Sequence, residues 1–213
     1  MARINKLTDL YPLMEPELPS CPEPLILQAL RKKTRQFCQD TDAWREQLKD
    51  IDLVAGQRDY VLNPSFDAEI RKIVEVRINT AANRAAGYIG VAVDSRKYVF
   101  HGELSQRLGA TLSPNTLTLD ESLKPAASET GGLEVKVSLA PLLMAGQVDQ
   151  DFLVKWCEAV IGGAMFYLMT MKDKKWTDPQ KAGLYLVDYN KGISRARREN
   201  VVGQNLQGGD LEG

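Results

Sequence analysis

Residues 149–171 read DQDFLVKWCEAVIGGAMFYLMTM and contain the longest apolar run of the chain, 159–171. Apolar residues recur here at three- and four-residue steps, which predicts a helix with a broad buried stripe. The stripe is made of Phe152, Leu153, Trp156, Val160, Ile161, Ala164, Met165 and Leu168. The opposite face is also apolar over 159–171, so the helix needs cover on every side. Either the chain's own core or a neighbouring subunit supplies that cover.

The two ends of this stretch carry further signals. Asp149 and Asp151 stand where a helix begins, which favours an N-cap and an acidic first turn over a pair of catalytic carboxylates. Gly162 and Gly163 lower helix stability, so their presence predicts that another backbone comes close.

A second helix follows, with the clearest start signal in the chain. Asp178 fits the N-cap and Pro179 the first helical position. Its predicted inward stripe is Ala182, Tyr185, Leu186, Tyr189, Ile193 and Ala196. The helix should close with Arg195, Arg197 and Arg198, cations that suit its negative end. Residues 201–213 then form a glycine-rich C-terminal tail, either loose or ordered by a partner.

The N-terminal half begins with proline. Residues 1–24 hold five prolines, which predicts an extended arm that lies against another surface. Residues 25–50 should be helical, with the stripe Leu27, Leu30, Thr34, Phe37, Thr41, Trp44 and Leu48. The same helix carries Arg31, Lys32, Lys33 and Arg35. These cations indicate either a solvated face or a surface that meets an acidic partner.

Between residues 51 and 141 the apolar period changes to two. Strands are predicted at 51–54, 60–62, 74–78, 89–93, 98–100, 117–119 and 133–139, with residues 80–87 as an unpatterned loop. One-sided alternation is typical of antiparallel sheets with one wet face. The expected fold class is therefore α+β. A helical bundle (25–50 and 148–200) is interrupted by an antiparallel β-rich insertion (51–141) and has extended N- and C-terminal arms (1–24 and 201–213).

Composition excludes several classes of function. The 213 residues include 27 Lys and Arg against 28 Asp and Glu, so a protein whose main task is to coat nucleic acid or an anionic membrane is not expected. Three cysteines without metal-type spacing indicate a reduced, cytoplasmic origin. The N-terminus lacks the apolar run of a signal peptide, and 159–171 is shorter than the roughly 20 residues of a membrane span, so we expect a soluble chain.

Catalytic signals are missing from the sequence. His101 is the single histidine and lies at a predicted strand end, where a solvated or hydrogen-bonded role is expected. Neither standard glycine-rich phosphate loop occurs. The sequence therefore predicts no enzyme activity, no catalytic residues, no metal site and no cofactor.

Several segments together resemble a structural family. They are LILQALRKKTRQFCQDTDAWREQL (25–48), IDLVAGQRDYVL (51–62), IVEVRIN (73–79), LEVKVSLAPLL (133–143), FLVKWCEAVIGGAMFYLM (152–169) and KKWTDPQKAGLYLVDYNKGISRARREN (174–200). In this order they are similar to the head-to-tail adaptor (connector) proteins of tailed bacteriophages, especially the short-tailed phage type. The most specific parts run from Trp44 to Tyr60 and through Trp176, Asp178, Pro179 and Ala182.

The resemblance implies a structural role in the virion at the head-tail junction, after synthesis in the host bacterial cytoplasm. Such adaptors form a ring beneath the portal protein, with twelve copies expected, and double-stranded DNA passes through the ring without sequence recognition. The C-terminal arm would bind the portal, and the β insertion would face a tail or nozzle protein. The implied portal-binding residues are Arg195, Arg197, Arg198, Val201, Val202 and Leu206. The implied subunit interface is Trp156, Val160, Gly163 and Phe166. No membrane takes part.

Other functions remain open. The chain could be another tail or neck component. It could also be a β-sheet ligand-binding module, which would need an exposed aromatic cluster drawn from Tyr60, Phe66, Tyr88, Tyr98 and Phe100. An enzyme that uses acidic residues alone is the third alternative, although no pair of carboxylates stands out.

Overall fold

The computed structural model describes residues 6–78, 110–113, 115–119 and 124–207, and these fall into two compact units. The helical unit contains the described residues up to Trp44, residues 66–68, and those from Ala140 onward. The β unit contains described residues within 45–65 and 69–139. Helices and antiparallel sheets together confirm the predicted α+β class.

The N-terminal segment is helical, so the prediction of an extended arm is wrong for its described part. Two 3-10 helices, η1 (Leu7–Leu10) and η2 (Glu15–Glu17), flank the short α1 (Tyr11–Met14). Pro12 and Pro16 occupy first-turn positions, where a missing N–H costs nothing. The apolar spacing is also helical, and its members are buried: Leu7, Leu10, Met14 and Leu18. The segment therefore packs into the helical unit's own core.

Helix α2 (Glu23–Thr41) ends earlier than predicted. Asp42 adopts a left-handed conformation with φ 51°, and its N–H bonds to the carbonyl oxygen of Cys38 at 2.9 Å. Aspartate tolerates this conformation better than most residues, so it can end a helix as glycine does. Trp44 is buried beyond the helix end, and Leu48 lies in a strand. Their three- and four-residue spacing misled the prediction that residues 25–50 are helical.

Helix α4 (Gln150–Met169) and helix α5 (Pro179–Gln207) begin at the predicted residues. The Asp149 carboxylate accepts the N–H of Phe152 at 3.0 Å. The Asp178 carboxylate accepts the N–H groups of Gln180 at 3.1 Å and Lys181 at 3.0 Å. Both aspartates are therefore N-caps. Helix α5 does not close near Arg198 as predicted. It continues to Gln207, so residues 201–207 of the predicted tail are helical.

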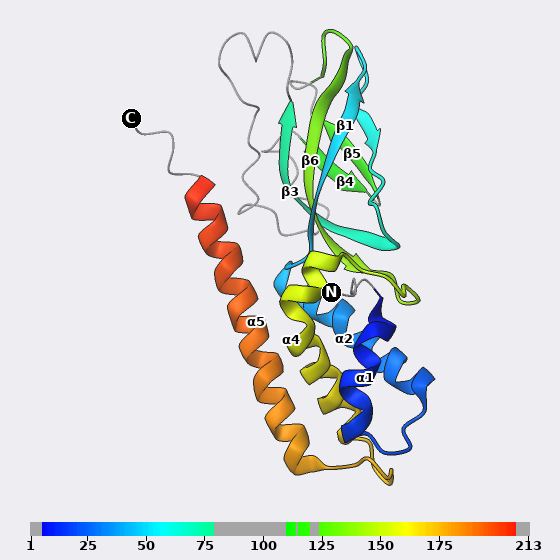
Figure 1. Cartoon of the computed structure of the whole chain (residues 1–213). Coiled ribbons are helices and arrows are strands. Elements are labelled where there is room, and N and C mark those ends of the chain that lie inside the picture. Colours follow the sequence, from blue (N-terminus) through cyan, green and yellow to red (C-terminus); the bar gives the residue numbers. More distant parts are fainter. Residues whose placement is uncertain (1–5, 79–109, 114, 120–123, 208–213) are drawn as a thin grey trace. The chain divides into compact units, whose positions relative to one another are not determined.

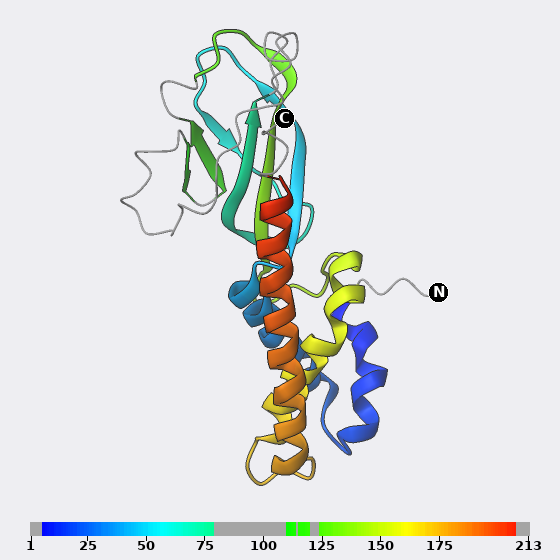
Figure 2. The same cartoon turned by 90° about the vertical axis from the view of Figure 1, so that its left-hand side faces the viewer.

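Helices α4 and α5 lie antiparallel and pack against each other, and α2 packs against α4 (Figure 1, Figure 2). The predicted close approach at the paired glycines is confirmed. A Cβ at Gly162 would lie 3.0 Å from the carbonyl oxygen of Tyr185, and one at Gly163 only 2.8 Å from the Tyr189 ring. A Cβ at Gly192, on α5, would lie 2.3 Å from the Cβ of Ala159. Small residues on both helices therefore set the α4–α5 contact.

Helix α4 has the length and apolar composition of a membrane span, in contrast to the expectation from residues 159–171 alone. Within the helical unit, 61% of its most apolar window is buried. Nearly all of its predicted stripe is buried, with Ile161 half-exposed. The chain's own residues thus cover most of this apolar helix, as in the core helix of a soluble protein.

The β unit contains two three-stranded sheets. One has the order β1 (Arg45–Leu53), β6 (Glu129–Pro141), β3 (Ala68–Ile78). The other has the order β2 (Asp59–Val61), β5 (Thr116–Leu119), β4 (Ala110–Ser113). Strand β1 pairs antiparallel with β6, from Arg45 opposite Ser138 to Leu53 opposite Glu129.

The predicted alternation in β6 is confirmed from Leu133 to Val137, but not at Ser138, which was expected on the exposed face and is buried. Leu133, Val135, Val137 and Leu139 are buried, while Glu134 and Lys136 remain partly exposed. The predicted strands at 89–93 and 98–100, the predicted loop at 80–87 and His101 lie outside the described residues.

Candidate functional site

The residues implied as ring contacts lie on α4, and most of them face the chain's own helices. Trp156 and Val160 are buried, and Gly163 is covered by the Tyr189 ring. Phe166 is partly buried. The Trp156 ring centroid lies 5.4 Å from that of Phe37 on α2. Burial within one chain thus explains Trp156, Val160 and Gly163, and none of the three is exposed for contact with a second subunit.

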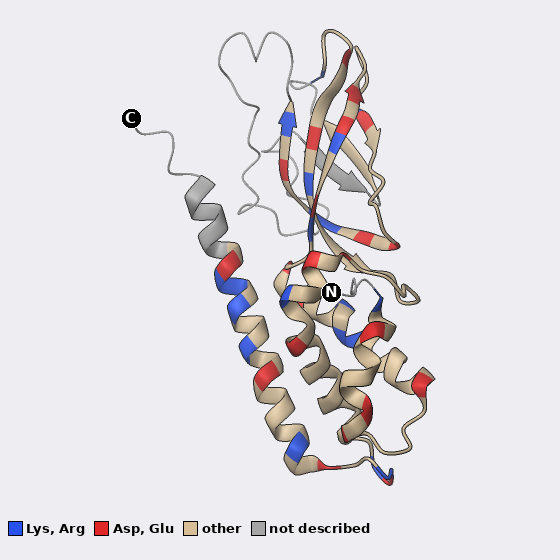
Figure 3. Cartoon of the chain, viewed as in Figure 1, with Lys and Arg blue, Asp and Glu red and all other residues tan. Residues whose placement is uncertain are grey.

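Three arginines implied as portal contacts are exposed on α5. Figure 3 shows Lys and Arg positions in blue along this helix. Arg195 donates from Nε to Glu199 at 3.0 Å, and its guanidinium lies 5.4 Å from the Trp156 ring centroid. Arg197 donates from Nε to the carbonyl oxygen of Asp40 at 2.9 Å. Arg198 is exposed on the same helix. Two of the three therefore help to hold α5 against the bundle.

Glu199 and Asn200 complete this attachment of α5. Glu199 accepts from Lys155 on α4 at 2.5 Å as well as from Arg195, and these bonds, the one from Lys155 foremost, lower the pKa of its carboxyl. The Asn200 amide donates to the carbonyl oxygen of Thr41, at the end of α2. Val201, Val202 and Leu206, the remaining implied portal contacts, follow in the last two turns of the helix backbone.

The basic cluster on α2 was expected to be either a solvated face or a surface for an acidic partner, and in the structure most of its cations contact groups of the same chain. Arg31 and Arg35 donate to the carbonyl oxygens of Ala145 and Pro141, at 3.2 and 3.0 Å. Lys32 is exposed, with its Nζ 4.3 Å from the Tyr167 ring centroid. The four cations thus bind groups of the same chain, and helical spacing alone could not reveal this.

Lys33, the fourth cation, is buried between α2, α4 and α5. Its Nζ donates to Gln36 at 2.9 Å and lies 5.5 Å from the Tyr189 ring centroid and 6.0 Å from that of Phe166. Burial lowers the pKa of Lys33, Lys32 lowers it further, and Asp40 opposes both. The buried Tyr189 hydroxyl has no hydrogen-bond partner among the described residues, and burial raises its pKa.

A surface feature that the sequence analysis missed is the turn between β6 and α4. Its three consecutive residues Leu142, Leu143 and Met144, hereafter the apolar loop, are 46%, 67% and 74% exposed. Backbone hydrogen bonds hold both ends: Leu142 N–H to Asp67 O at 2.9 Å and Leu7 N–H to Gly146 O at 3.1 Å. The signal was present in the sequence, since PLLMAG places four apolar residues between a proline and a glycine.

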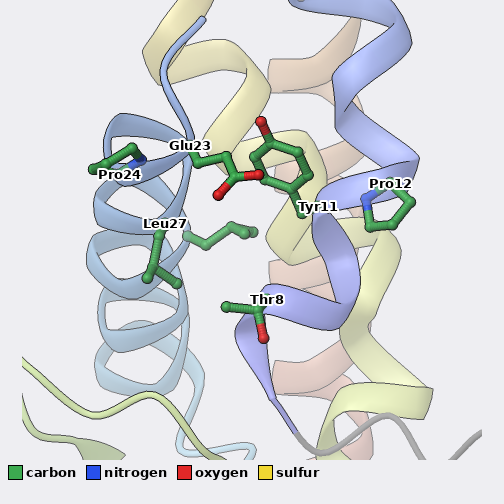
Figure 4. Close-up of a pocket in the computed structure, with 7 residues that line it drawn as sticks. Thr8, Tyr11, Pro12, Glu23, Pro24 and Leu27 are labelled. Carbon is green, nitrogen blue, oxygen red and sulfur yellow. The ribbon is translucent and has the colours of Figure 1, made fainter.

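A pocket of about 320 Å³ opens between the N-terminal helical turns and the first turns of α2 (Figure 4). Its walls are mainly apolar, and it is lined by Thr8, Tyr11, Pro12, Glu23, Pro24, Leu27 and Leu30. Partial burial raises the pKa of Tyr11, and the nearby carboxylates of Glu23 and Glu15 raise it further. This pocket, hereafter the acidic-rimmed pocket, combines an apolar interior with negative charge at its edge.

The described residues hold no cluster of three or more His, Cys, Asp or Glu that could bind a metal ion. Tyr60 is buried in β2, and Phe66 packs on Trp44 at 5.7 Å between ring centroids. These two candidates therefore do not contribute to an exposed aromatic platform. Tyr88, Tyr98 and Phe100 lie outside the described residues. Neither models of known protein families nor curated protein sequences match this chain.

Proposed function

We propose that this chain is a structural, non-enzymatic virion protein, a head-to-tail adaptor of the short-tailed phage type. It binds beneath the portal protein as a ring, extends the DNA channel and provides the surface to which the tail attaches. The observation that supports this most is the form of α5. The 29-residue helix is fixed to the bundle as far as Asn200, and its backbone continues as helix to Gln207.

Helix α5 is held firmly by the bundle, which suits an arm that binds a partner protein. The helix contacts α4 through closely packed glycines and is bonded to α2 through Arg197 and Asn200. These contacts hold α5 as far as Asn200 and so set the direction of its last two turns, residues 201–207. The arginines Arg195, Arg197 and Arg198 come just before those turns. In this proposal the C-terminal arm, residues 201–213, makes the contact with the portal.

Ring contacts belong on side chains that a neighbouring copy can reach. In this proposal they involve Phe166 and the exposed apolar residues of α4 and α5, which are Val154, Leu184 and Val187. Contacts with a tail or nozzle protein fall on the β unit, where Val54 and Val61 are exposed. The net charge of −1 suits a channel through which DNA passes without being held.

Portal binding tests the proposal. Deletion of residues 201–213 should leave a folded chain that no longer joins the portal ring. Arg198→Glu should weaken portal binding at least about tenfold at low salt, because it reverses one exposed charge at the proposed contact. Lys191→Glu is the matched control, since it makes the same reversal two turns earlier on the same face of α5. Unchanged portal binding by the deletion variant would contradict the proposed role of the C-terminal arm.

A further inference from the structure

The apolar loop is exposed although the chain holds it firmly. Arg31 and Arg35 donate to the carbonyl oxygens on either side of it, and the backbone N–H of Leu7 donates to the carbonyl oxygen of Gly146, two residues beyond it. Its exposure is therefore a fixed feature of the helical unit. A fixed loop loses little conformational freedom when it docks, so its apolar side chains are prepared for a contact.

The acidic-rimmed pocket has the size and lining for such side chains. Its volume, about 320 Å³, is at the lower end of the range for small-molecule sites, roughly 300–1,000 Å³. Leu27 and Leu30 lie in its apolar lining, beside two prolines and the Tyr11 ring. Few polar groups converge on it, which favours an aliphatic side chain over a polar ligand.

Charge distinguishes the two surfaces further. Glu23 lines the pocket, and the carboxylates of Glu23 and Glu15 lie close enough to Tyr11 to raise its pKa. The base of the apolar loop is instead basic. It is bonded to Arg31 and Arg35 and to the backbone beside Lys6, with Asp67 as an acidic neighbour.

We propose that two copies of this chain pair by inserting the apolar loop of each copy into the acidic-rimmed pocket of the other. Apolar side chains then fill an apolar pocket, and the cations at the base of the loop meet the carboxylates at its rim. Both surfaces lie along α2, because the pocket lining includes Glu23, Pro24, Leu27 and Leu30, and Arg31 and Arg35 hold the loop. Adjacent complementary patches on one surface suit a reciprocal contact with two-fold symmetry.

This pairing goes beyond the proposed function and does not depend on it. It uses the N-terminal turns, α2 and the apolar loop, whereas portal binding uses the end of α5. Self-association and portal binding are therefore separate measurements, and one can fail without the other.

Thiol cross-linking tests the reciprocal contact directly. The full chain would carry Met144→Cys and Pro24→Cys in a Cys157→Ser background, because Cys157 is the partly exposed native cysteine and Cys21 and Cys38 are buried. A short thiol cross-linker should give a covalent dimer and nothing larger, and each single cysteine variant controls for random collision. A ladder of larger species would show a head-to-tail contact and overturn the reciprocal arrangement. Cross-linking no better than in the single variants would overturn the pairing itself.

Sedimentation equilibrium gives a second, quantitative test. The double variant Leu143→Ser, Met144→Ser should raise the dissociation constant of the dimer at least about 100-fold. The reason is that the dimer has two loop-in-pocket contacts, and the variant removes both apolar side chains from each of them. Both residues are exposed, so the fold should be unaffected. Val61→Ser is the control, because Val61 is a similarly exposed apolar residue, at 65%, that belongs to neither of the two surfaces. Equal dissociation constants for the loop variant and the wild type would contradict the proposal.

Discussion

Two glycines on α5 allow the packing of the helical unit to be tested with one substitution in two places. A Cβ added at Gly192 would lie 2.3 Å from the Cβ of Ala159 on α4 and 3.6 Å from the Phe37 ring. A Cβ added at Gly183 would meet nothing within 4 Å. Replacement of either glycine by alanine changes the helix propensity of α5 equally, so the two variants differ only in what the new methyl group meets.

The expected effects have opposite signs. Alanine in place of glycine stabilises a helix by about 0.5–1 kcal/mol, so Gly183→Ala should raise the free energy of unfolding by about that amount. Gly192→Ala gains the same propensity, but it forces α4 and α5 apart because a Cβ cannot rotate away. Overpacking of this kind costs about 1–3 kcal/mol. The two variants should therefore differ by about 1–3 kcal/mol, with Gly192→Ala the less stable.

Tryptophan fluorescence during urea unfolding is the appropriate assay. The chain's three tryptophans, Trp44, Trp156 and Trp176, all belong to the helical unit, so the signal reports on that unit alone. The midpoints and slopes of the two variants and the wild type give the comparison. If Gly192→Ala stabilised the unit as much as Gly183→Ala, the close contact between α4 and α5 would be refuted.

Three further predictions follow from single side chains. Asp149→Ala should destabilise the helical unit by about 1 kcal/mol in the same urea assay, because the N–H of Phe152 loses its acceptor; no change would rule out the cap. Burial lowers the native pKa of Lys33, so the unfolded chain binds more protons between that pKa and the usual value of about 10.5. The stability of the wild type relative to Lys33→Met should therefore rise with pH through that window, and a flat difference would contradict the burial of this amine. Burial also raises the pKa of the Cys38 thiol, so in the native protein a thiol reagent should modify Cys157 well before Cys38, and equal rates would refute this order.

Much of the fold was predictable because local signals and tertiary structure agree. The caps at Asp149 and Asp178 mark helix starts by chemistry that acts within one turn. The alternation of Leu133, Val135 and Val137 marks a strand with one buried face. The α+β class follows from these elements alone.

The errors occur where one pattern fits two structures. Trp44 and Leu48 continue the helical spacing of α2, but Asp42 ends that helix in a left-handed conformation that no spacing rule detects. The prolines before residue 24 suggested an extended chain, yet Pro12 and Pro16 each begin a helical turn. The site features depended on tertiary structure: the acidic-rimmed pocket forms between segments that are separate in the sequence.

The most direct test of the adaptor proposal is the hydrodynamic mass of the purified chain of 213 residues, alone and after mixing with a candidate portal ring. The account predicts that the chain joins the portal in a fixed stoichiometry to give a single larger ring, and that the chain without residues 201–213 does not join. A chain of 213 residues that sediments separately from the portal ring at every mixing ratio would contradict the account.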